Sequence, residues 1–273
     1  MNRSIEDGRI DMRRKTLVAS VIGLALGASM TLWAQASDSE SASLLARVDK
    51  QVTFADTDFS AEYLIVKRDP GGAMSTTRAV IFRRDRDKEF LVLVLEPEID
   101  KGKGYLKVGD NLWLYDPVGK SFTFTSAKER FENSSVRTSD FNGSDFSGDY
   151  RAVASRREQL GKFDCTVLDL EARNDSVSFP KQRIWVSSGD DLVRKVEDYS
   201  LSGQLMRTTA IPTYQRVGDR WVPLMMVIVD NLKSRVIGGR TEYERTTVTI
   251  SKPSLKGLPD SVYTKDYLER VSQ

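Results

Sequence analysis

From Ser60 onward, short runs of β-prone residues alternate with turn sequences, within residues 63–125 and again within 151–250. Typical turns are Asp69-Pro70-Gly71-Gly72, Val108-Gly109-Asp110-Asn111 and Ser202-Gly203, in which glycine can adopt positive φ. Because nearly all connections are short, neighbouring runs are expected to pair as antiparallel strands. The pattern predicts one meandering sheet of about 11–12 strands in a single domain.

Two of the predicted strands, Phe90–Leu95 and Trp221–Val229, are apolar on both faces rather than alternating. Such strands are covered on two sides. A sheet of this width must coil, close or split, and a barrel or half-barrel with a helix across its mouth is the economical solution. Two interpretations stay open: a packed sandwich with a filled core, or a curved sheet whose inner face lines a hydrophobic cavity.

Helices are expected at three places. Ser37-Asp38-Ser39-Glu40 fits a capping box, and the apolar residues that follow it recur at helical spacing, which predicts an amphipathic helix over 38–54. That helix is either an ordinary packed helix or part of a lid. Residues 126–149 are polar and are expected to form a loop with one or two short helices, and residues 258–268 a helical turn and a short helix.

The N-terminus has the order of a secretory signal peptide. Arg13-Arg14-Lys15 precedes the apolar run Leu17–Met30, and Ala34-Gln35-Ala36 follows it. We expect residues 1–36 to be the signal peptide, with Met12 as an alternative start, and residues 37–273 to be the exported domain. The expected localisation is periplasmic, and an uncleaved membrane anchor is the alternative.

Charge and cysteine content narrow the choice of partners. The chain has 41 Lys/Arg and 39 Asp/Glu; residues 1–36 hold five and three of these, which leaves 36 of each. A neutral exported chain argues against nucleic acid as a partner. The single cysteine, Cys165, cannot form an intramolecular disulfide and is expected to be a small buried hydrophobe.

Few residues in the sequence point to chemistry. The chain has no histidine, which excludes Ser-His-Asp and Cys-His catalysis and the usual zinc sites. Asp140, Asp145 and Asp149 do not have the spacing of an EF-hand, and Glu96 and Glu98 are weak evidence for a glycosidase pair. The sequence therefore predicts no catalytic residue, no metal and no cofactor, and it indicates that the protein is not an enzyme.

Three runs in order along the chain resemble the LolA-like family of periplasmic outer-membrane lipoprotein-sorting proteins. Gly104–Pro117 resembles its strand-turn-strand with Gly-Asp, Leu-Trp-x-Tyr and Pro. Phe141–Phe146 resembles the Gly-(Ser/Thr)-Asp-Phe element of the longer members, and Leu258–Leu268 resembles their ending. The likeness spans essentially residues 37–273.

This resemblance implies a mainly β fold in which one large antiparallel sheet forms an unclosed β-barrel with a helical lid. Acyl chains of lipoproteins, or another lipid, would occupy the apolar inner face. It also implies a monomeric carrier that receives cargo from an inner-membrane transporter and passes it to an outer-membrane acceptor. In the family an arginine on a strand before the Trp-containing hairpin latches the lid, and Arg83 and Arg84 are the nearest candidates.

The candidate cavity-lining residues are apolar side chains of the predicted strands. Where both parities of a strand are apolar, its inward face cannot be decided from sequence. The candidates are Leu91, Leu93, Trp113, Tyr115, Met225, Met226 and Ile228. Two other functions stay open: a periplasmic sensor of the same fold that signals through a partner, and a lipid-binding accessory of an exporter.

Overall fold

The computed structural model describes residues 25–273 of the chain. By its internal contacts the chain divides into two compact units, Met1–Ser39 and Glu40–Gln273. The expected signal peptide lies in the first unit, and its residues 1–24 fall outside the described residues. Among residues 25–273, no helix combines the length and the apolar character needed to cross a membrane.

Helix α1 (Ala25–Val52) begins earlier than the sequence predicted. The expected start at Ser37 was wrong, because Ser37 lies inside a continuous helix. In a continuous helix, the carbonyl groups of the preceding turn accept hydrogen bonds from the backbone N–H groups of these residues. No side-chain cap is therefore needed at Ser37. The predicted apolar spacing is confirmed, since Leu44, Leu45 and Val48 are buried against the sheet.

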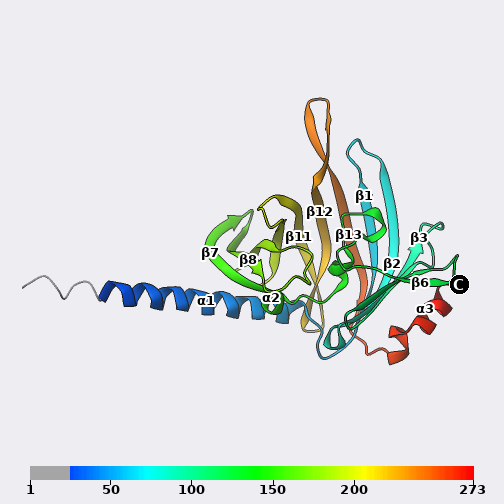
Figure 1. Cartoon of the computed structure of the whole chain (residues 1–273), viewed down its shortest axis with the longest axis horizontal. Helices are drawn as coiled ribbons and strands as arrows, with labels where there is room; N and C mark the ends of the chain where they lie inside the picture. Colours follow the sequence, from blue (N-terminus) through cyan, green and yellow to red (C-terminus); the bar gives the residue numbers. More distant parts are fainter. Residues whose placement is uncertain (1–24) are drawn as a thin grey trace, which may run out of the picture. The chain divides into compact units, whose positions relative to one another are not determined.

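The second unit is built on one 13-stranded antiparallel sheet (Figure 1). The strands are β1 (Phe59–Arg68), β2 (Met74–Arg84), β3 (Glu89–Glu96), β4 (Gly104–Val108), β5 (Asn111–Asp116), β6 (Ser121–Phe124), β7 (Tyr150–Leu160), β8 (Phe163–Ala172), β9 (Lys181–Ser187), β10 (Val193–Tyr199), β11 (Leu205–Val217), β12 (Arg220–Ile237) and β13 (Arg240–Ser254). The sheet has more strands than the predicted 11–12, because every β-prone run forms a paired strand. Even the four-residue edge strand β6 pairs with β5.

The order of the strands explains why the sheet is open. It runs β6-β5-β4-β3-β2-β1-β13-β12-β11-β10-β9-β8-β7, so sequence neighbours pair everywhere except at the β1–β13 seam in the middle. The two edges, β6 and β7, do not pair with each other, and they lie on opposite sides of the unit in Figure 1. The predicted unclosed antiparallel barrel is confirmed.

The chain between the two edge strands lies across one face, which we call the inner face. This cover segment, residues 126–149, contains the helical turns η2 (Phe131–Asn133), η3 (Thr138–Phe141) and α2 (Phe146–Asp149). Phe131 and Phe141 of the cover segment pack in the same cluster as Phe90, Val92 and Val94 of β3. A second inner cluster joins the end of α1 to strands β8–β10.

The opposite, outer face is covered by the C-terminal segment. The turns η1 (Asp85–Asp87) and η4 (Asp260–Tyr263) precede β3 and α3 (Lys265–Val271), and Leu268 of α3 packs on Leu91, Leu93 and Leu106. Gly104 makes this contact possible, because a Cβ there would lie 2.3 Å from Cδ1 of Leu268. Strand β3 is thus apolar on both faces because both faces are covered.

Candidate functional site

A cavity of about 1100 Å³ lies between the inner face of the sheet and the cover segment. Its floor includes Val196 of β10, Met226 and Ile228 of β12 and Val248 of β13, and the cover segment adds Phe141. Most of these side chains belong to or pack on the buried clusters of the sheet. This volume lies just above the usual range of small-molecule pockets, about 300–1,000 Å³. The arrangement can hold an extended apolar group against a curved wall.

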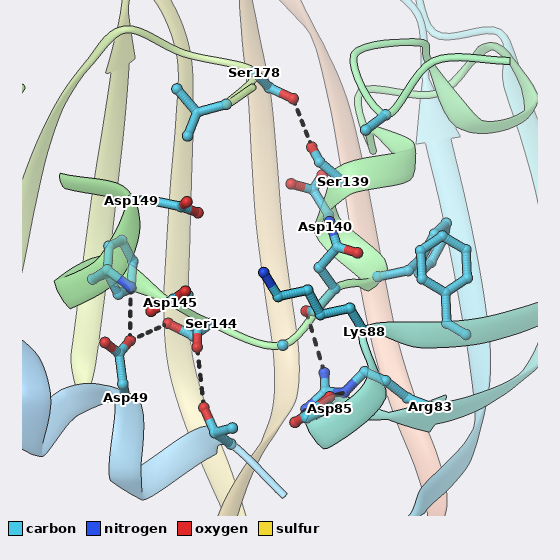
Figure 2. A pocket seen from close by; sticks show the side chains of 18 of the residues that line it. Asp49, Arg83, Asp85, Lys88, Ser139, Asp140, Ser144, Asp145, Asp149 and Ser178 are labelled. Atoms are coloured by element: carbon cyan, nitrogen blue, oxygen red, sulfur yellow. Dashed lines mark hydrogen bonds and ion pairs between the residues drawn. The ribbon is translucent and has the colours of Figure 1, made fainter. Parts of the chain in front are cut away.

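One end of the cavity is polar and charged, as Figure 2 shows. Lys88 points into the space there, toward the side on which Asp149 lies. Lys107 is deeper and donates to Oδ1 of Asn142 at 2.9 Å. Burial, with the nearby Lys88 charge, lowers the pKa of Lys107, and burial raises the pKa of Asp149. The cavity is therefore amphipathic.

Asp49 near the end of α1 fixes the Gly-Ser-Asp-Phe element, whose role the sequence left open. Its carboxylate accepts hydrogen bonds from the Ser144 hydroxyl at 2.8 Å, the Phe146 N–H at 2.9 Å, and both the N–H and the hydroxyl of Ser147 at 2.8 Å (Figure 2). Thr53 adds a hydrogen bond to the Ser144 carbonyl at 3.1 Å. The element therefore connects α1 to the cover segment.

Arg83 lies where α1, the sheet and the cover segment meet. Its guanidinium donates to the Val52 carbonyl at 3.3 Å and to the Asn142 carbonyl at 3.4 Å, and it pairs with Asp85 at 2.6 Å. Asp85 in turn accepts from the Phe54 N–H at 2.8 Å. A Cβ at Gly143 would lie 2.8 Å from Cγ of Asp85, so glycine is what lets the cover segment approach this pair.

Arg84, the other latch candidate, has different partners. As strand neighbours, the two arginines point to opposite faces. Arg84 pairs with Asp58 at 3.0 Å and Asp260 at 2.7 Å, and donates to the Leu258 carbonyl at 2.7 Å. It therefore holds the C-terminal segment, and of the two candidates only Arg83 bonds to the cover segment and to the end of α1.

The seven lining candidates are divided between the two faces. Met226 and Ile228 line the cavity. Met225 is exposed on β12, beside an irregularity in the pairing with β11. The other four pack on the outer face with the cluster around α3: Leu91, Leu93, Trp113 and Tyr115. Whether Met226 and Ile228 touch a ligand stays a prediction.

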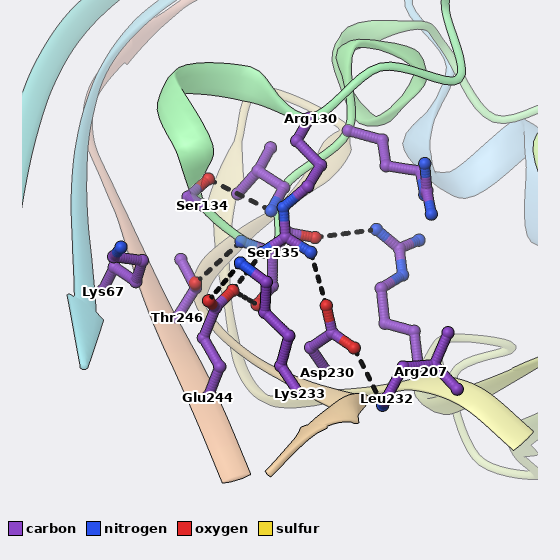
Figure 3. A network of polar contacts seen from close by, with 12 residues as sticks. Lys67, Arg130, Ser134, Ser135, Arg207, Asp230, Leu232, Lys233, Glu244 and Thr246 are labelled. Carbon is purple, nitrogen blue, oxygen red and sulfur yellow. Dashed lines mark hydrogen bonds and ion pairs between the residues drawn. The ribbon is translucent and has the colours of Figure 1, made fainter. Parts of the chain in front are cut away.

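Two groups of ion pairs that the sequence did not indicate also tie the cover segment to the sheet. Arg207 of β11 pairs with Asp140 of the cover segment at 2.6 Å and with buried Asp198 at 2.7 Å. Burial disfavours the charged guanidinium, but the charges of these two carboxylates outweigh it and raise the pKa of Arg207. In the second group, Arg130 pairs with Asp230 and with Glu244, which is completely buried (Figure 3).

The second group continues beyond Arg130. Glu244 also accepts from the Ser135 hydroxyl at 2.8 Å and pairs with Lys233 at 3.0 Å. Among residues 25–273, no group of three or more acidic or cysteine side chains has the geometry of a metal site.

Comparisons with known proteins agree with this architecture. A family model with the description "uncharacterized protein" matches residues 86–270. The crystal structure of a LolA superfamily protein from Nitrosomonas europaea is 26% identical, with a TM-score of 0.71 over 83% of this chain and 98% of that chain. No curated protein sequence matches the chain significantly.

A second solved structure shows the same fold. It is a domain from Vibrio parahaemolyticus, provisionally described as outer membrane lipoprotein-sorting, with 18% identity and a TM-score of 0.74 over 85% of this chain and 100% of that chain. The chain belongs to the family of uncharacterized proteins whose model matches residues 86–270, and its fold and its 26% identity to the Nitrosomonas europaea structure make it LolA-like.

Proposed function

We propose that the protein is a periplasmic carrier that holds acyl chains, of a lipoprotein or of another lipid, in the inner-face cavity and delivers them to the outer membrane. The observation that carries the proposal is the cavity of about 1100 Å³, which is apolar on its floor. The cover segment above it is held both by the buried side chains of Phe131 and Phe141 and by ion pairs to the sheet. An expected signal peptide at residues 1–36 agrees with a periplasmic location.

Acyl transport is an energetic problem that such a cavity solves. Exposing an acyl chain to water costs ~0.8 kcal/mol per CH₂, so a long chain costs on the order of 10 kcal/mol. A carrier removes most of that penalty by burying the chain, and this requires no catalytic group. The inner-membrane donor and outer-membrane acceptor of this proposal follow from the resemblance.

Release requires that the cargo-free state also be stable. Arg83, which lines the cavity, can provide this stability, because it joins the end of α1 to the cover segment through the Val52 and Asn142 carbonyls. Cargo that parts α1 from the cover segment would break these bonds, and their recovery would favour release. In this proposal the carrier exchanges between latched and open populations, and cargo binds the open one.

Adjacent methionines give a matched test of the cavity. Met226→Trp fills part of the cavity, whereas Met225→Trp adds the same ring to an exposed site. We expect a fluorescent C16 fatty acid to bind Met226→Trp at least tenfold more weakly than the wild type, and Met225→Trp to bind it like the wild type. Equal affinity in both variants would place the lipid outside the cavity.

The cargo itself can be identified by native mass spectrometry of protein purified from its own periplasm. Co-purified triacylated lipoprotein would support the carrier of lipoproteins, and free lipid would support a role with an exporter. An empty protein that retains a signalling partner would favour the sensor and contradict the carrier.

A further inference from the structure

Two long β-hairpins extend beyond the rest of the sheet, and their tips lie close together in space although they are far apart in the sequence. The β1–β2 hairpin and the β12–β13 hairpin extend side by side at the top of Figure 1. The N–H of Gly71 donates to Oε2 of Glu242 at 3.1 Å, and a Cβ at Gly71 would lie 3.3 Å from Cδ1 of Ile237. These hairpin tips, residues 67–75 and 232–245, therefore form one surface.

This surface carries an excess of positive charge, because its residues include six Lys/Arg and only three Asp/Glu, among them Glu242 opposite Arg235. Arg68, Arg235, Arg240 and Arg245 are exposed, and within residues 25–273 none of them forms an ion pair. The other basic residues there are compensated, since Lys67 pairs with Asp69 and Lys233 with Glu244. Four arginines without an ion pair thus gather on a surface of net charge +3 (6 − 3), on a chain that is neutral beyond residue 36.

The same surface exposes apolar side chains. Met74 is 66% exposed, Val236 69%, Leu232 50% and Tyr243 42%. Along the β12–β13 hairpin they alternate with the arginines, since Leu232 and Val236 flank Arg235 and Tyr243 lies between Arg240 and Arg245. Apolar and aromatic side chains mixed with arginines suit the boundary between lipid head groups and acyl chains, where the cations meet phosphates and the apolar groups insert.

We propose that the hairpin tips dock the protein on a membrane surface rich in anionic phospholipid. Each basic residue near such a surface is attracted to it, and the attraction fades within a Debye length. Because residues 37–273 are neutral as a whole, the attraction comes from the local arginines alone, acts at short range and is sensitive to salt. The base of the β12–β13 hairpin carries Asp230 and Glu244, which bind Arg130 of the cover segment (Figure 3), so the docked surface adjoins the roof of the cavity.

The test is sedimentation with vesicles, using the chain from residue 37 onward. That chain contains every residue of the four hydrophobic clusters. We expect binding to vesicles of phosphatidylethanolamine with phosphatidylglycerol, loss of it at 0.5 M salt, and little binding to phosphatidylcholine alone. The double variant R235E/R240E should bind the anionic vesicles at least tenfold more weakly than the wild type.

The matched control is K120E/K256E, which makes the same change of net charge at two exposed lysines in the β5–β6 turn and after β13. It should bind the anionic vesicles like the wild type, and both double variants should keep their affinity for a fluorescent C16 fatty acid. Equal loss in both double variants, or wild-type binding to neutral vesicles at high salt, would overturn the proposal. Binding only to vesicles that contain native membrane proteins would overturn it in favour of a protein partner.

Discussion

Asp58 is the carboxylate on which the C-terminal segment depends. It accepts hydrogen bonds from Arg84 at 3.0 Å, Arg86 at 3.0 Å and the Leu258 N–H at 2.6 Å, and its side chain is 1% exposed. Burial opposes its charge, but the hydrogen bonds and the two guanidinium charges prevail and lower its pKa below 3.8. The stability that Asp58 contributes is therefore present above its unfolded pKa and is lost as pH falls through the lower folded value.

We predict that Asp58→Asn lowers the free energy of unfolding by about 3 kcal/mol at pH 7, because it leaves buried Arg84 beside a neutral amide. The difference from the wild type should start to shrink as pH falls below about 3.8, because the unfolded chain then takes up a proton at Asp58 while the folded protein resists it down to its lower pKa. Urea unfolding between pH 3 and 7 measures this. Asp87→Asn, at a 51% exposed neighbour, should cost less than about 1 kcal/mol. A constant difference across this pH range would contradict the assignment.

Single residues also show why sequence reasoning placed only part of the site. Met225 and Met226 are adjacent and chemically identical, but the pairing of β11 with β12 is irregular opposite Met225, and only Met226 lines the cavity. Leu91 and Leu93 turn outward because α3 covers that face, a contact between residues more than 170 positions apart. The face to which each of these side chains points depends on tertiary packing. The pattern of apolar and polar residues along one strand does not encode it.

At the scale of elements, the strands were predictable because turn chemistry marks their ends. The covering of the sheet was not, since the cover segment is polar and lacks a hydrophobic period. One signal was available: Asp49 lies in the last turns of α1, where a negative charge is unfavourable to the helix dipole. A carboxylate at this position therefore indicates hydrogen-bond donors outside the helix. These donors are the hydroxyl groups of Ser144 and Ser147 and the backbone N–H groups of Phe146 and Ser147.

We predict that Asp49→Ala releases the α1–α2 contact. The variant leaves four donors without their acceptor, which should cost about 2–4 kcal/mol in the free energy of unfolding. Hydrogen exchange should accelerate first in residues 141–149 rather than in the sheet. Glu40→Ala, at an exposed position of the same helix, is the control and should leave both measurements near wild type. Unchanged exchange in residues 141–149 would show that Asp49 does not hold the cover segment.

At the scale of the whole molecule, the cavity separates two apolar clusters that share one sheet. Phe90 and Ile228 line it from the cluster of the β1–β13 seam, and Tyr150 and Val196 line it from the cluster under α1. The width of the predicted sheet implied that it must curve. Whether the fold is a filled sandwich or encloses a cavity depends on the distance between the cover segment and the inner face of the sheet. No local sequence pattern determines that distance.

A lipid in this position would contact both clusters and should stabilise them together. At a concentration one hundred times its Kd, a ligand that binds only the folded state adds about 2.7 kcal/mol. For a domain of this size that corresponds to a rise in Tm of about 5–10 °C. We therefore predict that a C16 fatty acid raises Tm by this amount and slows hydrogen exchange in both β3 and β9. Met226→Trp should show a much smaller rise under the same conditions. Protection confined to one of the two strands would mean that the ligand occupies only one side, and an equal rise in Met226→Trp would mean that it binds elsewhere.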